Sequence, residues 1–79
     1  MDETIRINFV SRNKWHKIIQ GFQSEQIEQI LEVRYPNGTV AGIICESQEG
    51  LFYLNGKPDV NYRSLQAAAE ALIKCKASA

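Results

Sequence analysis

Positive and aromatic side chains gather in one short segment of the N-terminal half. Arg12, Lys14 and Lys17 supply three positive charges there, and Trp15 and His16 lie between them. Cationic side chains around an aromatic ring can contact phosphates while the ring stacks on a base, so this segment is a candidate nucleic-acid contact. The alternative interpretation is that Trp15 belongs to the core and that the charges are ordinary solvated residues.

A row of acidic residues follows at the spacing of one helical face. Glu25, Glu28 and Glu32 stand at i, i+3 and i+7. Three carboxylates can gather a hard cation, but such a row is more commonly a solvated face, and we predict no metal site. Together the basic segment and the acidic row predict a dipolar surface, which suits docking to a specific partner or to a second copy of the chain.

The other reactive residue types form no catalytic pattern. His16 is the only histidine, and neither a metal-ligand spacing nor a nucleophile motif accompanies it, so we expect it at the surface. Cys45 and Cys75 stand thirty residues apart, which matches neither a disulfide framework nor a zinc site. We expect both to be small buried side chains. The chain is therefore predicted to be no enzyme and to hold no cofactor.

Length and charge narrow the class of protein. The 79 residues are enough for a single small domain, residues 1–79. Nine Lys and Arg residues balance nine Asp and Glu residues, and zero net charge disfavours a general nucleic-acid or membrane-surface binder. The acidic segment Met1–Glu3 lacks the apolar region of a signal peptide, and no apolar run is as long as a membrane span. We therefore expect a cytoplasmic location and no membrane partner.

The N-terminal half predicts one strand and then helix. Apolar and polar residues alternate in residues 4–10, which is the period of a half-buried strand. The next apolar residues recur at i, i+3, i+4 and i+7, and they are Trp15, Ile18, Ile19 and Phe22. A second stripe at Ile27, Ile30 and Leu31 extends this helical pattern. Residues 12–31 are thus expected to form either one kinked helix or two short ones.

The C-terminal half predicts a hairpin, a third strand and a helix. Residues 36–38, Pro-Asn-Gly, favour a tight turn between an alternating strand and the nearly continuous apolar run of residues 40–45. That run suits a central strand covered on both faces, or on one face with a bulge at Gly42. Residues 51–54 predict another strand and residues 57–61 a loop. Ser64 then caps an alanine-rich helix with one apolar face.

These elements sum to an α+β fold. We expect a three- to four-stranded, mainly antiparallel sheet, with the C-terminal helix and one or two helices of the N-terminal half packed on it. Both the C-terminal helix and the helix that contains Trp15 should cover the same face of the sheet.

Residues 15–76 resemble a known family pattern. Trp15–Gly21 predicts a helix that ends in a glycine, Leu54-Asn55-Gly56 ends a short strand, and Tyr62-Arg63-Ser64 precedes a helix that contains Ala67-Ala68-Ala69. This order is similar to the RAMA module, the small domain found beside adenine methylases in restriction systems, and to related bacterial and phage modules. The resemblance implies a module that recognises DNA without catalysis of its own.

Two functions are consistent with the sequence. The leading hypothesis is a non-enzymatic, DNA-associated binding module encoded by a phage or mobile element. Its expected phosphate contacts are Arg12, Lys14, Lys17, Arg34 and Arg63. The alternative is a small protein-interaction or regulatory protein, or a homodimer, that docks through a charged surface. A contiguous positive face favours nucleic acid, whereas separate positive and negative regions favour a protein partner.

Overall fold

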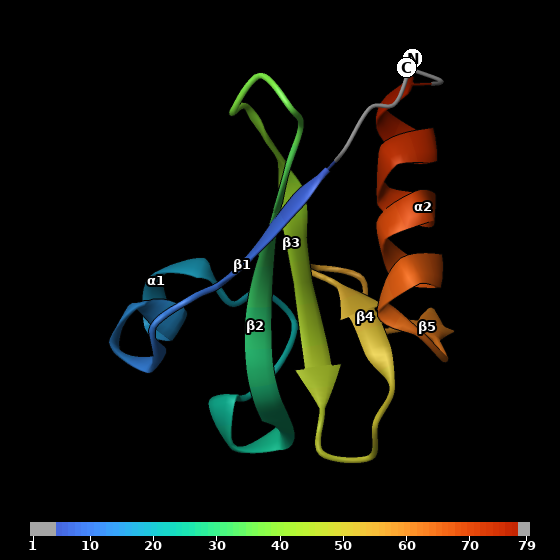
Figure 1. Cartoon of the computed structure of the whole chain (residues 1–79). Coiled ribbons are helices and arrows are strands. Elements are labelled where there is room, and N and C mark those ends of the chain that lie inside the picture. Colours follow the sequence, from blue (N-terminus) through green and yellow to red (C-terminus); the bar gives the residue numbers. More distant parts are fainter. Residues whose placement is uncertain (1–4, 78–79) are drawn as a thin grey trace.

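Over its described residues the chain folds into a five-stranded antiparallel sheet with helices on both faces (Figure 1). The computed structural model describes residues 5–77, and their side chains through residue 74. The strands, which pair in chain order, are β1 (Arg6–Phe9), β2 (Ile27–Arg34), β3 (Val40–Ser47), β4 (Phe52–Leu54) and β5 (Asn61–Tyr62). The helices are the 3₁₀ helices η1 (Arg12–Lys14) and η2 (Ser24–Gln26) and the α-helices α1 (Trp15–Ile18) and α2 (Leu65–Ala77). The predicted α+β class with an antiparallel sheet and a C-terminal helix is confirmed.

The sheet has one strand more than the upper limit of the prediction. Residues 57–61 were predicted to be loop throughout, yet Asn61 and Tyr62 pair with β4 as a two-residue edge strand. Pro58 and Asp59 remain in the loop, as expected from residues that break strands. A strand of two residues carries no periodic pattern, which is why the sequence did not reveal it.

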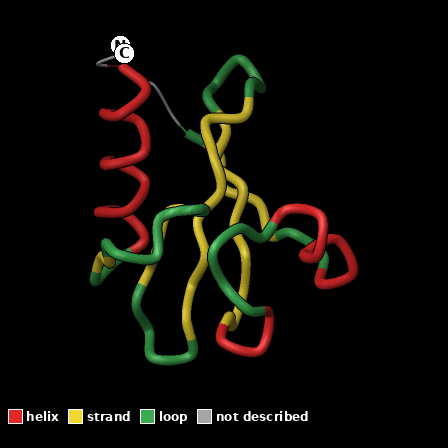
Figure 2. Tube along the Cα trace, turned by 180° about the vertical axis from the view of Figure 1, so that it is seen from behind, coloured by secondary structure: helices red, strands yellow, loops and turns green. Residues whose placement is uncertain are grey.

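A separate hydrophobic core lies on each face of the sheet. Adjacent strand residues point to opposite faces, so Leu31 and Ile44 face α2 whereas Ile30 and Cys45 face α1. All four side chains are buried, and β3 is therefore covered on both faces, as one of the two predictions had it. The prediction that the two helices share one face was wrong, because they lie on opposite sides of the sheet (Figure 1 and Figure 2). Val10 already packs in the α1 core, so the chain leaves β1 on that side.

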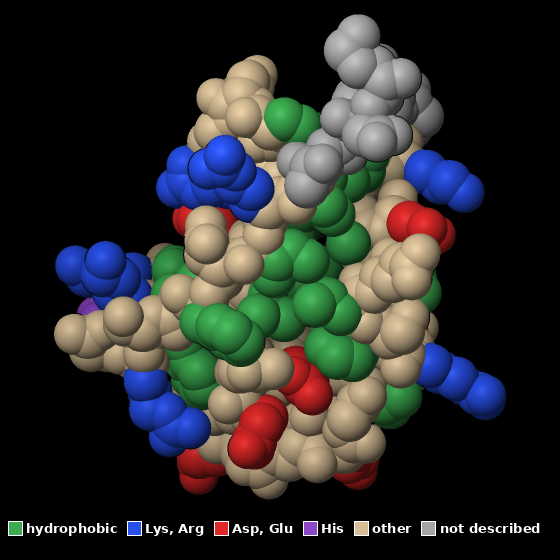
Figure 3. Space-filling view, viewed as in Figure 1, with side chains coloured by type: hydrophobic (Ala, Val, Ile, Leu, Met, Phe, Trp, Pro, Cys, Tyr) green, Lys and Arg blue, Asp and Glu red, His purple; other side chains and the backbone are tan. Residues whose placement is uncertain are grey.

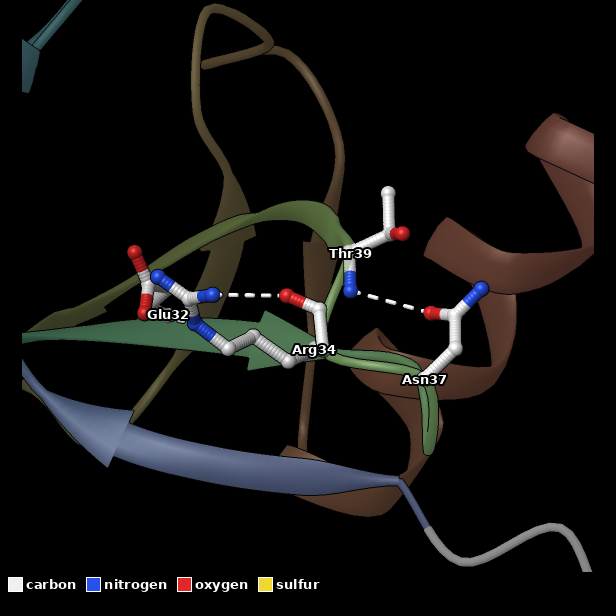
Figure 4. A network of polar contacts seen from close by, with 5 residues as sticks. Glu32, Arg34, Asn37 and Thr39 are labelled. Carbon is white, nitrogen blue, oxygen red and sulfur yellow. Dashed lines mark hydrogen bonds and ion pairs between the residues drawn. The ribbon is translucent and has the colours of Figure 1, made fainter.

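The hairpin between β2 and β3 is confirmed (Figure 4). Tyr35 N–H donates to the carbonyl of Thr39, and Gly38 N–H donates to the carbonyl of Tyr35, both at 2.9 Å. The side-chain Oδ1 of Asn37 accepts the N–H of Thr39 at 2.9 Å. Gly38 has a φ of 92°, a conformation that glycine adopts without steric cost. The turn is closed by contacts among its own residues, which makes it readable from sequence.

The start of β2 was predicted to be helix, and that prediction was wrong. The pairing of β2 with β3 shifts register between Ile27 and Gln29, which leaves Glu28 as the extra residue of a β-bulge. The bulge turns Ile27 to the same face as Ile30, and both pack in the α1 core. Two apolar residues three positions apart on one face imitate the period of a helix. A single inserted residue thus explains the misleading stripe.

The helix predicted from Trp15 is present but is shorter than its apolar stripe. It ends at Ile18, because Ile19 has the extended backbone of φ −63° and ψ 131°. Ile19 and Phe22 still pack in the α1 core, from an irregular segment. Trp15 is only 4% exposed, and its Nε1–H donates to the carbonyl of Val10 at 3.0 Å. The interpretation of Trp15 as a core residue is therefore confirmed.

Helix α2 begins at its predicted cap. Ser64 Oγ accepts the N–H of Ala67 at 3.1 Å, which satisfies one of the free donors of the first turn. Ala68 and Ala69 are buried against the sheet. The predicted burial of Cys75 lies outside the described side chains.

Strand β3 approaches α2 closely at Gly42. A Cβ atom at this position would lie 2.6 Å from Cδ1 of Leu72, which is closer than such atoms approach. The pairing of β2 with β3 also shifts here, between Val33 and Arg34, and leaves Ala41 as the extra residue directly before Gly42. The irregularity that the sequence predicted at Gly42 is thus found one residue earlier.

Candidate functional site

Three of the five predicted DNA contacts lie together on the α1 side of the molecule. Arg12 and Lys14 belong to η1 and Lys17 belongs to α1, and all three side chains are exposed. The Cζ atom of Arg12 lies 4.8 Å from the centre of the Trp15 ring, so the guanidinium stacks on a core residue. Because Trp15 is buried, the segment offers positive charge but no free ring for stacking on a base.

The other two predicted DNA contacts are placed differently. Nε of Arg34 lies 2.6 Å from Oε1 of Glu32, and Nη1 of Arg34 donates to the carbonyl of Gly38 at 2.6 Å (Figure 4). This guanidinium is therefore paired and also holds the hairpin. Arg63 stands between β5 and α2, at the edge of the sheet opposite to β1. The structure thus does not bring the five residues into one cluster.

The acidic residues do not form the predicted helical face. Glu25 lies in η2, Glu28 is the bulge residue of β2, and Glu32 forms the ion pair with Arg34. Nε2 of Gln48 donates to the carbonyl of Glu25 at 2.8 Å, which joins η2 to the turn between β3 and β4. Among the residues that the structure describes, no three His, Cys, Asp or Glu side chains are grouped to hold a metal ion.

Positive and negative side chains are concentrated in different regions. Figure 3 shows Lys and Arg side chains gathered over β1 and α1, and Asp and Glu side chains mainly near the lower end of the molecule. Further side chains of both signs stand beside α2. The basic region consists of Arg6, Arg12, Lys14, Lys17 and Arg34. The acidic region, around η2 and the β3–β4 turn, consists of Glu25, Glu28, Glu46 and Glu49. This separation is the pattern that favours a protein partner over nucleic acid.

An apolar groove lies between β1 and α2, on the face opposite to α1. Helix α2 packs mainly against β3, β4 and β5, which leaves the β1 side of this face without a helix above it. The groove has a volume of about 370 Å³, and its apolar lining consists of Ile5, Ile7, Leu65, Ala69 and Ile73. Figure 3 shows this lining as a continuous green area. Phe9, the last residue of β1, is 72% exposed.

The backbone of β1 has one free side next to this groove. Among the described strands, β1 pairs only with β2. Directly after β1, Val10 N–H donates to the carbonyl of Ile30 at 2.9 Å. Backbone groups that point toward and away from the partner alternate along an edge strand. The N–H and C=O groups of Ile7 and Phe9 therefore point away from β2, toward the open edge of the sheet.

Neither Cys45 nor His16 forms a reactive site. Cys45 is buried, as expected, and burial raises the pKa of its thiol to about 11. Reaction of a cysteine proceeds through its thiolate, so this thiol is unreactive at neutral pH. His16 lies exposed on α1, which confirms the expectation of a surface histidine.

Sequence reasoning missed both the groove and the open edge. The alternation in residues 4–10 predicted a strand, but its place at the edge follows from its pairing with β2, whose first half was predicted to be helix. One signal for an edge strand was present in the sequence. Arg6 and Asn8 alternate with the apolar residues Ile7 and Phe9, so one face of the strand is polar.

Within residues 5–77, no helix is long and apolar enough to cross a membrane. Comparison of the chain with protein-family models, with curated proteins and with solved structures found no match. The resemblance to the RAMA module accordingly stays a hypothesis.

Proposed function

We propose that the chain is a non-enzymatic binding module that docks on a protein partner through the edge of β1. The observation that carries this proposal is the outward-pointing backbone of Ile7 and Phe9 beside the apolar groove. An exposed edge of this kind accepts an extended segment as a further strand, with main-chain hydrogen bonds for affinity and side-chain contacts for specificity. The large exposed ring of Phe9 supports the same reading, because such a ring is a typical anchor in protein interfaces.

The charge distribution also supports a protein partner. The net charge is zero, and the basic and acidic regions are separate. Two of the five proposed phosphate contacts are not free cations of the basic region. Arg34 lies in this region but is paired with Glu32, and Arg63 lies outside it, at the β5 edge. A surface that binds DNA by its phosphates needs several unpaired cations side by side.

Phosphate binding on DNA is the second candidate function, and it rests on the exposed group of Arg12, Lys14 and Lys17. Mobility shift of a short DNA duplex at low ionic strength tests it, because phosphate contacts are strongest there. A shift that disappears when all three residues are changed to alanine favours DNA. Absence of any shift at low ionic strength eliminates this candidate.

Selection of random peptides displayed on phage tests the protein-binding proposal. The decisive variants are Phe9→Ala and Phe9→Pro. Both remove the ring, but only proline also removes the outward N–H, and proline at this position costs no hydrogen bond to β2. Selected peptides should bind the Phe9→Pro variant more weakly than the Phe9→Ala variant, and they should shift the NMR signals of β1. Equal binding to the two variants would overturn the proposal.

A further inference from the structure

The two faces of β1 at the open edge differ in chemistry, since one carries Ile7 and Phe9 and the other carries Arg6. This difference predicts the residue types of a partner strand. Resting on the proposed function, we infer that the strand added to β1 alternates apolar and acidic residues, with its apolar side toward α2 and its acidic side toward α1.

The apolar half of this inference follows from the face of β1 that carries Ile7 and Phe9. Phe9 pairs with Leu31 and Ile7 pairs with Val33, and both partners belong to the core beneath α2. A strand added outside β1 would lie about 4.8 Å from it, and side chains on the same face of neighbouring strands contact one another. Every second residue of the added strand would therefore meet Ile7, Phe9 and the apolar groove.

The acidic half follows from the opposite face of β1. Arg6 is exposed there and stands directly opposite Arg34 in the register of β1 with β2. Glu32 pairs with Arg34, and among the described residues no carboxylate pairs with Arg6. The side chains of Arg12, Lys14 and Lys17 add further positive charge on this side. Residues of an added strand that face this side lie next to Arg6, where a carboxylate is favoured and a cation is repelled.

A second copy of this chain fits the same edge less well. In an antiparallel pair of two β1 strands, the side that carries Arg6 and Asn8 would meet the same side of the copy. Each copy would then bring Arg6, Arg34 and one carboxylate, that of Glu32, to the shared face, so positive charge would exceed negative charge there. The charge pattern therefore favours a different, acidic segment over self-pairing.

The test uses the full chain and two short capped peptides. One peptide alternates Val and Glu, and the other has Lys in place of each Glu. The Val–Glu peptide should bind wild type roughly fivefold more tightly than the Val–Lys peptide, which is the scale of one exposed ion pair. The Val–Glu peptide should shift the NMR signals of β1, and added salt should weaken its binding. Arg6→Glu should reverse this preference, and because Arg6 is exposed the variant should keep the wild-type melting temperature.

The outcomes separate this inference from the proposed function. Equal binding of both peptides at β1 would overturn the acidic chemistry and leave strand addition standing. No binding of either peptide, together with selected peptides that ignore Phe9→Pro, would overturn both. A doubled mass in solution with protected β1 amides would overturn the inference in favour of a second copy.

Discussion

Helix α2 covers the β3–β5 part of its face of the sheet with thirteen residues of regular helix, whereas the opposite face is covered by the single turn of α1 and by irregular chain. A regular helix satisfies most of its backbone hydrogen bonds internally. On the α1 side, some backbone groups are instead hydrogen-bonded to a side chain that is distant in the sequence. Asn55 donates to the carbonyl of Ile18 at 2.7 Å and accepts the N–H of Gln20 at 2.9 Å.

The two faces are therefore sensitive to different kinds of substitution. On the α2 face, stability depends on close packing of small residues, as at Gly42 beneath Leu72. On the α1 face it depends on a few residues that tie the irregular chain to the sheet, among them Trp15 and Asn55. Substitutions that add volume should therefore destabilise the α2 face, and substitutions that remove a tying side chain should destabilise the α1 face.

The largest effect is expected from Trp15→Ala. Removal of this buried ring should lower the free energy of unfolding by about 3–5 kcal/mol, measured by urea denaturation. Trp15→Phe keeps a ring and loses the bond to the carbonyl of Val10, so it should cost less. Phe9→Ala, at an exposed ring, is the matched control and should change stability by no more than about 0.5 kcal/mol. A loss below about 1 kcal/mol for Trp15→Ala would contradict the role of Trp15 as an anchor.

Asn55→Ala should come next, at about 2 kcal/mol, because it leaves the carbonyl of Ile18 and the N–H of Gln20 without their partner. Amide hydrogen exchange should accelerate at Gln20 more than in α2. Asn55→Asp keeps the acceptor for Gln20 and loses the donor to Ile18, so it should protect the Gln20 amide better than alanine does. Unchanged exchange at Gln20 in the alanine variant would show that the α1 side is held by other contacts.

Gly42→Ala tests the α2 face, where added volume should destabilise the fold by about 1 kcal/mol. The new methyl group collides with Leu72, which must move. A double-mutant cycle with Leu72→Ala separates this collision from other causes. The double variant should lose less stability than the sum of the losses measured for the two single variants. Strict additivity would rule out the collision as the cause.

The last effect comes from Cys45 and leaves stability at neutral pH unchanged, because it is confined to alkaline pH. Its thiol has a pKa of about 11 in the folded chain against an ordinary value of 9.0, so the protonated form is favoured by folding. The resulting stability is fully present below pH 9 and is lost as the pH rises from there through about 11. With Cys75→Ala as background, the melting temperature should fall over this window more steeply than when Cys45→Ala is added. Parallel profiles of the two proteins would contradict this linkage.

The elements that the sequence predicted correctly are those closed by neighbouring residues. The β2–β3 turn depends on Asn37 and Gly38, and the start of α2 depends on Ser64. The first half of β2 could not be predicted, because the bulge at Glu28 is defined only by pairing with β3. The assignment of α1 and α2 to opposite faces likewise depends on contacts between distant segments.

In the candidate site, too, features set by neighbouring residues were predictable, and features set by contacts between distant segments were not. Clustering of Arg12, Lys14 and Lys17 was readable, because these residues are neighbours in the sequence. The pairing of Arg34 with Glu32 required the strand that was predicted as helix, and the distance of Arg63 from the cluster required the whole topology. The groove joins residues from the two ends of the chain, and no local pattern connects Ile7 with Ile73.

The two borders of the sheet are unequal in length. β5 contributes two residues and runs at once toward α2, whereas β1 contributes four. Growth of a fibril by edge-to-edge pairing of sheets requires a receptive border on both sides of every molecule, and a very short border strand is a poor template for such pairing. When the longer border strand of such a chain has paired once, only the short border strand is left. The chain can therefore add one strand at β1 without forming a polymer.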